Sequence, residues 1–146
     1  MAKRLANDRR LWVESATPGT FNMVKGNQNL SISRSGGTID GTSKDDFPFM
    51  INLPGPRNLS LGASFIPDLP DVNGFERLQT VARATTVTPI NIQVRKGGAA
   101  GVAPGDVEFE CSMYVTDDNM DAGQGKVIDN SFVFVPAAAP TVDALK

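Results

Sequence analysis

Two acidic side chains on one predicted strand form the most suggestive chemical pair in this sequence. Glu108 and Glu110 stand two residues apart in an alternating segment, which places them on one strand face about 7 Å apart. Carboxyl pairs separated by about 5–10 Å can hydrolyse glycosidic bonds. The spacing therefore allows a small hydrolase, although a plain solvated strand face produces the same pattern far more often.

Other chemistries find little support. The absence of histidine excludes Ser-His-Asp and Cys-His catalysis and zinc sites that need imidazole. The single cysteine, Cys111, excludes internal disulfides and falls on an apolar strand face, as an inert core residue does. The acidic run 117–121 lacks calcium-loop spacing, and the glycine-rich run 97–101 lacks the rest of a phosphate-binding loop. We predict no catalytic residue, no metal and no cofactor.

Length and composition indicate one soluble domain. The chain has 146 residues, of which 40% are hydrophobic and 21% charged, and its net charge is −2. These values argue against disorder, a membrane protein and a surface that grips nucleic acid. No apolar run is long enough for a secretory signal or a spanning helix, so we expect synthesis in the cytosol. Residues 1–100 carry a net +4 and residues 101–146 a net −6, which fits either a well-mixed surface or complementarity between copies.

Alternation of apolar and polar residues dominates the chain and predicts a sheet with one apolar and one wet face. We expect strands over 11–14, 20–25, 27–34, 57–65, 88–96, 106–116 and 127–135. Residues 72–84 instead show helical spacing, with Asp71 or Asn73 able to cap the start and Glu76 able to complete a capping box. This one helix should lie across the apolar face of the sheet.

The segment 35–56 is rich in glycine and proline, which predicts a long, hairpin-like loop. It nevertheless contains apolar residues between Phe47 and Leu53. Either these residues fold back as an edge strand, or a neighbouring subunit covers them. The two ends of the chain, 1–10 and 137–146, read as arms that a partner could order.

The order of these elements resembles the major tail tube proteins of long-tailed (siphovirus-type) bacteriophages. The residues that carry the resemblance are Ser31-Ile32-Ser33, the run Thr38 to Ser43, Asp45-Asp46, the run Pro56 to Phe65, and the helix from Phe75 to Ala82. Together they span about residues 10–136. The stretch 48–56 and the loop 97–105 depart from the family pattern.

The resemblance implies a mainly β fold, a small antiparallel β-sandwich or half-barrel with a flanking helix. It also implies a structural protein without catalysis, whose hexameric rings stack into a hollow tube that conducts DNA during ejection. Ring closure would remove open sheet edges, which are a liability in a monomer. The loop 35–56 and the arms 1–10 and 137–146 would bridge successive rings. The inter-subunit candidates in that loop are Asp45, Asp46, Phe47, Phe49, Met50 and Ile51.

A DNA conduit should not attract phosphate, so its wall should be acidic or neutral. Our first candidates for the lumen are Asp106, Glu108 and Glu110, and our second are Asn58, Ser60 and Ser64. The alternative is that these faces look outward to water.

The resemblance also implies the surroundings of the protein: a virion tail assembled in the host cytoplasm, with tail-tip or baseplate, tail-terminator and tape-measure proteins as partners. DNA would pass without specific binding, and no membrane contact is expected. A runner-up is the inner-tube protein of a contractile tail or injector. A sugar-binding β-sandwich is more remote, because the chain has one tryptophan and one tyrosine and so cannot form the usual aromatic platform.

Overall fold

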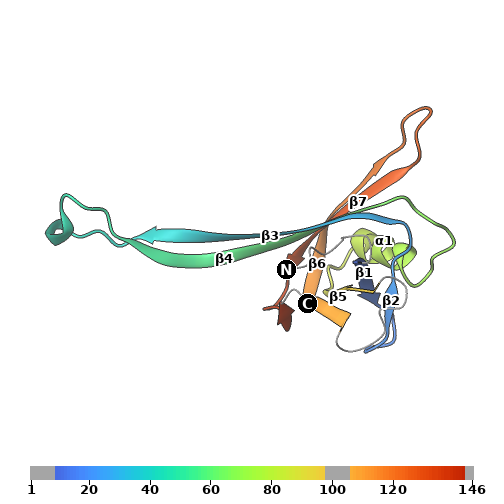
Figure 1. The fold of residues 1–146 in the computed structure, drawn as a ribbon, viewed down its shortest axis with the longest axis horizontal. Helices are drawn as coiled ribbons and strands as arrows, with labels where there is room; N and C mark the ends of the chain where they lie inside the picture. Colours follow the sequence, from blue (N-terminus) through green and yellow to red (C-terminus); the bar gives the residue numbers. More distant parts are fainter. Residues whose placement is uncertain (1–8, 98–105, 144–146) are drawn as a thin grey trace, which may run out of the picture.

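The computed structural model describes residues 9–97 and 106–143, and an antiparallel sheet organises them (Figure 1). The strands are β1 (Arg10–Glu14), β2 (Phe21–Met23), β3 (Asn27–Asp40), β4 (Asn52–Phe65), β5 (Ile90–Arg95), β6 (Val107–Asp121), β7 (Asp129–Pro136) and β8 (Val142–Asp143). Helix α1 spans Phe75–Arg83, and a 3-10 turn, η1, spans Lys44–Asp46. The sheet order is β2-β1-β5-β6-β7-β4-β3, and β8 pairs with β6. The mainly antiparallel β fold with one flanking helix is confirmed.

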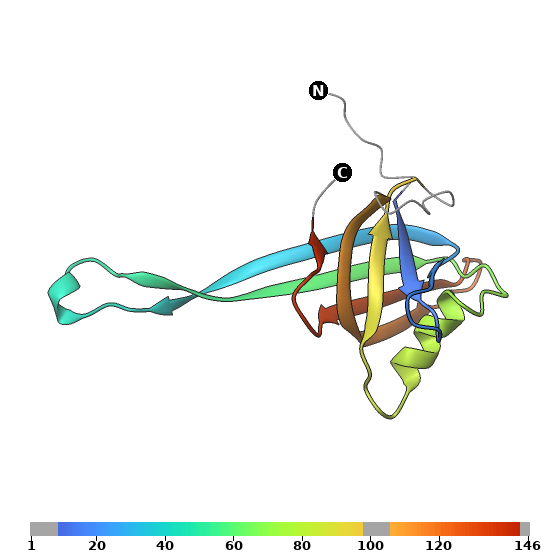
Figure 2. The ribbon, with the colours of Figure 1, turned by 90° about the horizontal axis from the view of Figure 1, so that it is seen from below.

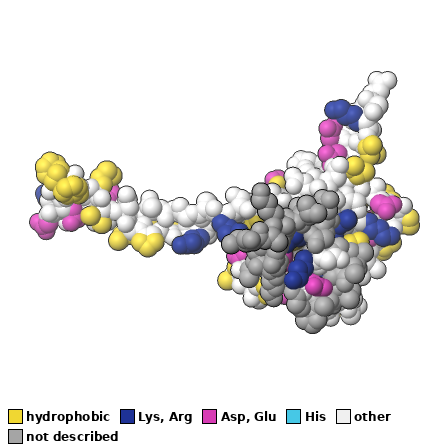
Figure 3. Space-filling model, viewed as in Figure 1, with side chains coloured by type: hydrophobic (Ala, Val, Ile, Leu, Met, Phe, Trp, Pro, Cys, Tyr) yellow, Lys and Arg dark blue, Asp and Glu magenta, His cyan; other side chains and the backbone are white. Residues whose placement is uncertain are grey.

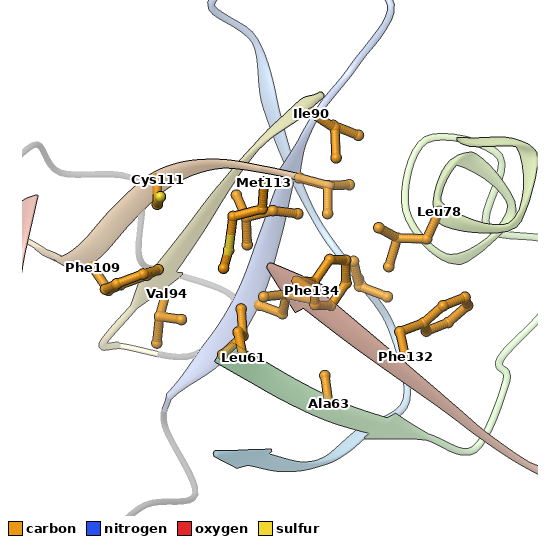
Figure 4. Packing of buried hydrophobic residues seen from close by; sticks show 14 of the residues in the cluster. Leu61, Ala63, Leu78, Ile90, Val94, Phe109, Cys111, Met113, Phe132 and Phe134 are labelled. Atoms are coloured by element: carbon orange, nitrogen blue, oxygen red, sulfur yellow. The ribbon is translucent and has the colours of Figure 1, made fainter. Parts of the chain in front are cut away.

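The sheet curls over itself around an aromatic core. Strands β1 and β5 cross the direction of β3, β4 and β7, while β6 joins the two groups by pairing with both β5 and β7 (Figure 2). The inward side chains of these strands meet in one cluster, which Figure 4 shows from close by. Phe65, Phe75 and Phe132 form a triangle of edge-to-face contacts, with ring centroids 5.7–6.2 Å apart. Such contacts add specific geometry to hydrophobic burial.

Helix α1 closes one side of this core, as its apolar spacing predicts. Phe75 and Leu78 are buried in the cluster. The helix is shorter than expected: it begins after Gly74, and Val72 lies outside it with 70% of its surface exposed. The Asn73–Glu76 capping box does not form, because the helix start has no side-chain cap at the residue that precedes it.

Asp71 holds the start of the helix instead. Its Oδ2 accepts hydrogen bonds at 3.0 Å from the backbone N–H of Phe75 and from that of Lys25, which follows β2. The adjoining turn needs glycine, because Gly26 has a φ of +77° and a Cβ there would stand 1.8 Å from the carbonyl oxygen of Ile66. One buried carboxylate therefore ties the helix to the β2–β3 turn.

The predicted hairpin-like loop 35–56 is a hairpin, and half of its residues are strand. Strands β3 and β4 pair without a break in direction from Asn27↔Phe65 to Asp40↔Asn52, and their outer half projects far from the body (Figures 1 and 2). We call residues 35–56 the arm and residues 41–51 its tip. The local sequence hides this strand character, because Pro54 and Pro56 lie within β4 and Gly36 and Gly37 lie within β3. Proline is tolerated at a strand edge, where no partner needs its missing N–H.

The pairing of the two strands in the arm is irregular at one point. A register shift lies between Gly36 and Thr38, as at a β-bulge. A Cβ on Gly55 would stand 3.0 Å from the backbone of Gly37, so the two glycines allow this close backbone approach.

Basic residues from the first part of the chain form ion pairs with acidic residues from the last part within one molecule. Three ion pairs each join a basic residue from positions 1–100 to an acidic residue from positions 101–146: Arg9–Glu108, Arg34–Asp143 and Arg83–Asp118. Because β6 lies between β5 and β7, the two halves of the sequence are interleaved in the sheet. The structure therefore favours a well-mixed surface over charge complementarity between copies.

The two ends of the chain, 1–10 and 137–146, fall partly outside the described residues. Of 1–10, the structure describes Arg9 and Arg10; of 137–146, it describes 137–143. The latter run back along β6, where the N–H of Ala137 bonds the carbonyl of Ser112 and β8 pairs with Phe109 and Glu110. No helix within the described ranges is long and apolar enough to cross a membrane.

Candidate functional site

The arm tip presents apolar side chains to solvent. Half of the exposed large hydrophobic residues in the described part of the chain lie on the arm. They are Ile39, Phe47, Phe49, Met50, Ile51 and Leu53, and Phe47 is the most exposed at 85%. They appear as yellow groups at the far end of the arm in Figure 3. Such a patch on a projecting element marks a contact surface.

Polar side chains order the backbone of this tip. The carboxylate of Asp46 accepts hydrogen bonds from the N–H and the hydroxyl of Ser43, at 2.8 and 3.0 Å. Thr42 Oγ1 accepts from the N–H of Ile51 at 2.8 Å. Asp40 accepts from the N–H of Thr42, and hydrogen bonds from Thr42 hold the pKa of Asp40 below its usual value. Phe47 to Ile51 are therefore displayed on a structured turn, whereas Leu53 lies in β4 and pairs with Ile39 of β3.

Glu108 and Glu110 share a strand face, but their environments differ. Glu108 is only 6% exposed, and both of its carboxylate oxygens accept hydrogen bonds at 3.0 Å from the guanidinium of Arg9. Glu110 is half-buried and lies where β8 pairs with β6. A carboxylate held at two points by arginine is a poor general acid or base. The described residues contain no group of three or more His, Cys, Asp or Glu side chains suited to a metal ion.

The same outer face of β1, β5 and β6 contains an aromatic cluster. The guanidinium of Arg95 lies 4.4 Å from the ring centroid of Trp12 and 5.7 Å from that of Phe21. Burial lowers the pKa of Arg95. Trp12 itself is only 6% exposed. A sugar-binding platform needs an open aromatic face, which this tryptophan does not offer.

A second face is mostly polar, although Val133 lies on it opposite Gly62 and Arg57 borders it. It crosses β3, β4 and β7 on the side away from the core, and we call it the serine face. Its cross-strand pairs include Ser33↔Ser60, Ser35↔Asn58, Asn29↔Ser64 and Ser64↔Ser131. Asn58 is exposed, whereas Ser60 and Ser64 are half-buried. The structure thus brings Asn58, Ser60 and Ser64 together on one surface, while Asp106, Glu108 and Glu110 lie on another.

A third feature escapes the sequence patterns. Exposed Leu69, Met120, Val127 and Ile128 gather around one hollow of about 370 Å³, which we call the groove. Ile66, Pro67, Phe75, Gln79 and Asn130 complete its lining. These residues come from the segment after β4, from α1, and from the turn between β6 and β7. The sequence shows apolar residues in these segments, but no periodic pattern indicates that three separate segments meet in one groove.

Comparison with known proteins identifies the fold. Neither the protein-family models nor the curated proteins contain a significant match to this sequence. Among solved structures, the chain is similar to a protein in the tail of an empty gene transfer agent particle with C6 symmetry. That likeness has a TM-score of 0.75 at 16% identity, over 97% of this chain and 100% of the other.

Two further structures show the same architecture. The SPP1 tail tube gives a TM-score of 0.71 at 11% identity, over 97% of this chain and 80% of the other. The sheath-tube complex of an extracellular contractile injection system gives 0.58 at 11% identity, over 93% and 89%. The fold that the sequence resemblance implies is therefore confirmed: the chain has the fold of tail tube subunits.

Proposed function

We propose that this chain is the major tail tube protein of a long-tailed bacteriophage or phage-like particle, and that its hexameric rings stack into a hollow, DNA-conducting tube. The arm tip is the observation that carries this proposal. A soluble monomer gains nothing from holding Phe47, Phe49 and Met50 in water on an ordered turn. A neighbouring copy that buries them turns the same arrangement into a stacking contact.

The sheet edges support a ring. Strand β3 is the last strand of the sheet order and is 14 residues long, so it offers unpaired backbone groups along one border. Strand β2 ends the other border. A closed cyclic arrangement covers borders of this kind without leaving a free end. The C6 symmetry reported for the gene transfer agent tail supplies the number of copies in the proposal.

An inner-tube protein of a contractile injection system is the second candidate. The likeness to a subunit of a contractile sheath-tube complex favours it. Its TM-score is lower than that of the gene transfer agent tail, which places the non-contractile assignment first.

We assign the bore of the tube to the serine face, which contains Asn58, Ser60 and Ser64. Hydroxyl and amide groups give phosphates little to bind, so DNA can slide past. The first candidates from the sequence, Asp106, Glu108 and Glu110, fit less well. Glu108 is paired with Arg9 and covered, so this carboxylate contributes little to a repelling wall.

The proposal places the protein in the tail of the virion, after assembly in the host cytoplasm. Its main partner is itself. Tail-tip or baseplate and tail-terminator proteins would cap the two ends of the tube. The tape-measure protein and the DNA would pass through the bore without specific binding, and the proposal involves no catalysis.

Assembly by the purified chain tests the proposal. Wild-type protein should form rings or hollow rods, visible by negative-stain microscopy and as large species in light scattering. The double variant Phe47→Ser/Phe49→Ser should remain a folded monomer. The matched control is Val72→Ser/Val87→Ser, which removes two equally exposed apolar residues elsewhere and should still give rods. Normal rods from the tip variant would contradict the role of the arm.

Labelling of assembled rods tests the assignment of the bore. Ser60→Cys and Glu110→Cys rods are made in a Cys111→Ala background and treated with biotin-maleimide, then with streptavidin. A bore position accepts the small reagent but excludes streptavidin, so Ser60→Cys rods should stay undecorated. Streptavidin along the walls of Ser60→Cys rods would refute the assignment.

A further inference from the structure

We propose that the groove lined by Leu69, Met120, Val127 and Ile128 receives the arm tip of another copy of this chain. This inference rests on the proposed function and names the surface that the tip contacts. It starts from the distribution of exposed apolar residues. Apart from the arm, such residues in the described chain are few, and most of them line this one groove.

The two apolar patches lie at opposite ends of the molecule. The tip is at the far end of the arm, whereas the groove lies beside α1 and the β6–β7 turn (Figures 1 and 2). Yellow side chains mark both ends in Figure 3. An arm therefore cannot reach its own groove. Two different patches that meet between copies make a head-to-tail contact, and such contacts generate stacks.

The size of the groove suits side chains from a turn. At about 370 Å³ it is near the lower limit of small-ligand pockets, which begin at about 300 Å³. It can accept one or two large side chains such as Phe47 and Phe49, but not a whole hairpin. A larger hollow of about 530 Å³ has Arg34, Arg57 and Asp143 on its lining. Arg34 and Asp143 already pair with each other there, so that hollow is less suited than the apolar groove to the aliphatic and aromatic side chains of the tip.

A buried polar group in the groove lacks a partner. Asn130 lines the groove and is 2% exposed, and its Nδ2 has no hydrogen-bond acceptor. Such groups are costly when unsatisfied. This Nδ2 is covered in the monomer, so an acceptor from the tip, such as the backbone carbonyl of Pro48, reaches it only if the groove opens when the aromatic side chains enter.

The first test places a charge in the groove. Ile128 is 48% exposed, so Ile128→Asp should leave the monomer folded. Loss of one buried aliphatic contact should raise the protein concentration needed for rods by at least about tenfold. Val87→Asp, an exposed apolar residue outside the groove, is the matched control and should assemble normally. Combining Ile128→Asp with Phe49→Lys should restore part of the assembly through an ion pair.

The second test uses cross-linking, in a Cys111→Ala background. Chains with Phe49→Cys are mixed with chains with Ile128→Cys, assembled and oxidised. Disulfide dimers should form in the mixture, because a docked tip brings the two positions within bonding distance. Replacing the second partner by Val87→Cys should abolish these dimers.

The outcomes separate the two proposals. If the wild-type chain forms no rods, the proposed function fails and the groove assignment fails with it. If wild-type and Ile128→Asp chains both form rods at the same concentration and no dimers appear, the groove assignment alone is overturned.

Discussion

Strands β3 and β4 run through both the body and the arm of this protein, but their apolar side chains are buried in the body and exposed in the arm. In the body, β3 and β4 place one face against the aromatic core, where Leu61 and Phe65 are fully buried. Beyond Asn58 the same pairing continues without a core, and Phe47 and Phe49 are mostly exposed. The backbone ladder is common to both regions, so burial is what separates them.

This difference teaches that the two regions draw stability from different sources. The body is satisfied within one chain, since five phenylalanines and the helix exclude water from its centre. The arm is held by backbone hydrogen bonds and by polar contacts at its tip. Its apolar residues are largely exposed and so contribute little burial to the folding of the monomer.

The largest expected effect is a loss of stability caused by a substitution in the body. Phe132→Ala removes a ring that contacts both other members of the aromatic triangle. This change should lower the free energy of unfolding by about 3–5 kcal/mol. Urea denaturation followed by circular dichroism measures this change. The arm variant Phe49→Ala should shift the same curve by less than about 0.5 kcal/mol, because a surface residue loses no core contact. Equal shifts would erase the proposed distinction.

A smaller effect is expected at the junction of helix and sheet. Asp71→Ala removes the acceptor shared by Phe75 and Lys25 and should cost about 1–2 kcal/mol. The neighbouring variant Asn73→Ala should cost almost nothing, because Asn73 caps no helix. Thermal unfolding of both variants checks the contrast, and a larger loss for Asn73→Ala would reverse the assignment of the cap.

Shortening the arm sharpens the comparison from the other side. Replacing residues 38–54 by Asn-Gly keeps the Gly36↔Arg57 pairing and should leave the free energy of unfolding within about 1 kcal/mol of wild type. The shortened chain should stay monomeric at concentrations where wild type forms rods. Calorimetry and light scattering give the two readings. A strong loss of stability would show that the arm supports the body.

The smallest expected effect concerns Cys111 and pH. Burial, and then the charge of Asp143, raise the pKa of this thiol above its ordinary value of 9.0. Well below pH 9 the thiol is neutral in both states, so its protonation does not make stability vary with pH there. As the pH rises further, the unfolded chain loses this proton first and stability falls.

Denaturation of wild type and Cys111→Ala at pH 7 and pH 10 measures that contribution. The loss between the two pH values should be smaller for the variant. A faster reaction of the native thiol with a disulfide reagent than of the unfolded one would contradict its burial.

The sequence predicts the elements of the body well, because alternation and helical spacing follow directly from which face is buried. It predicts the exposed tip residues, but reads the arm as a loop, since the prolines and glycines of 48–56 are local loop signals. Pairing with β3 overrides them, and that pairing is tertiary. The Arg9–Glu108 ion pair joins residues 99 positions apart. The groove combines three segments, so no local pattern reveals it.

The two prolines in the outer half of β4 have a consequence for how rods can grow. An unpaired strand edge can pair with a strand of another molecule, and such pairing leads to fibrils. Pro54 and Pro56 supply no amide hydrogens there, so an intruding strand would find gaps in the ladder. This edge of β4 therefore disfavours strand addition, and contact through the few side chains at the end of the arm is favoured instead.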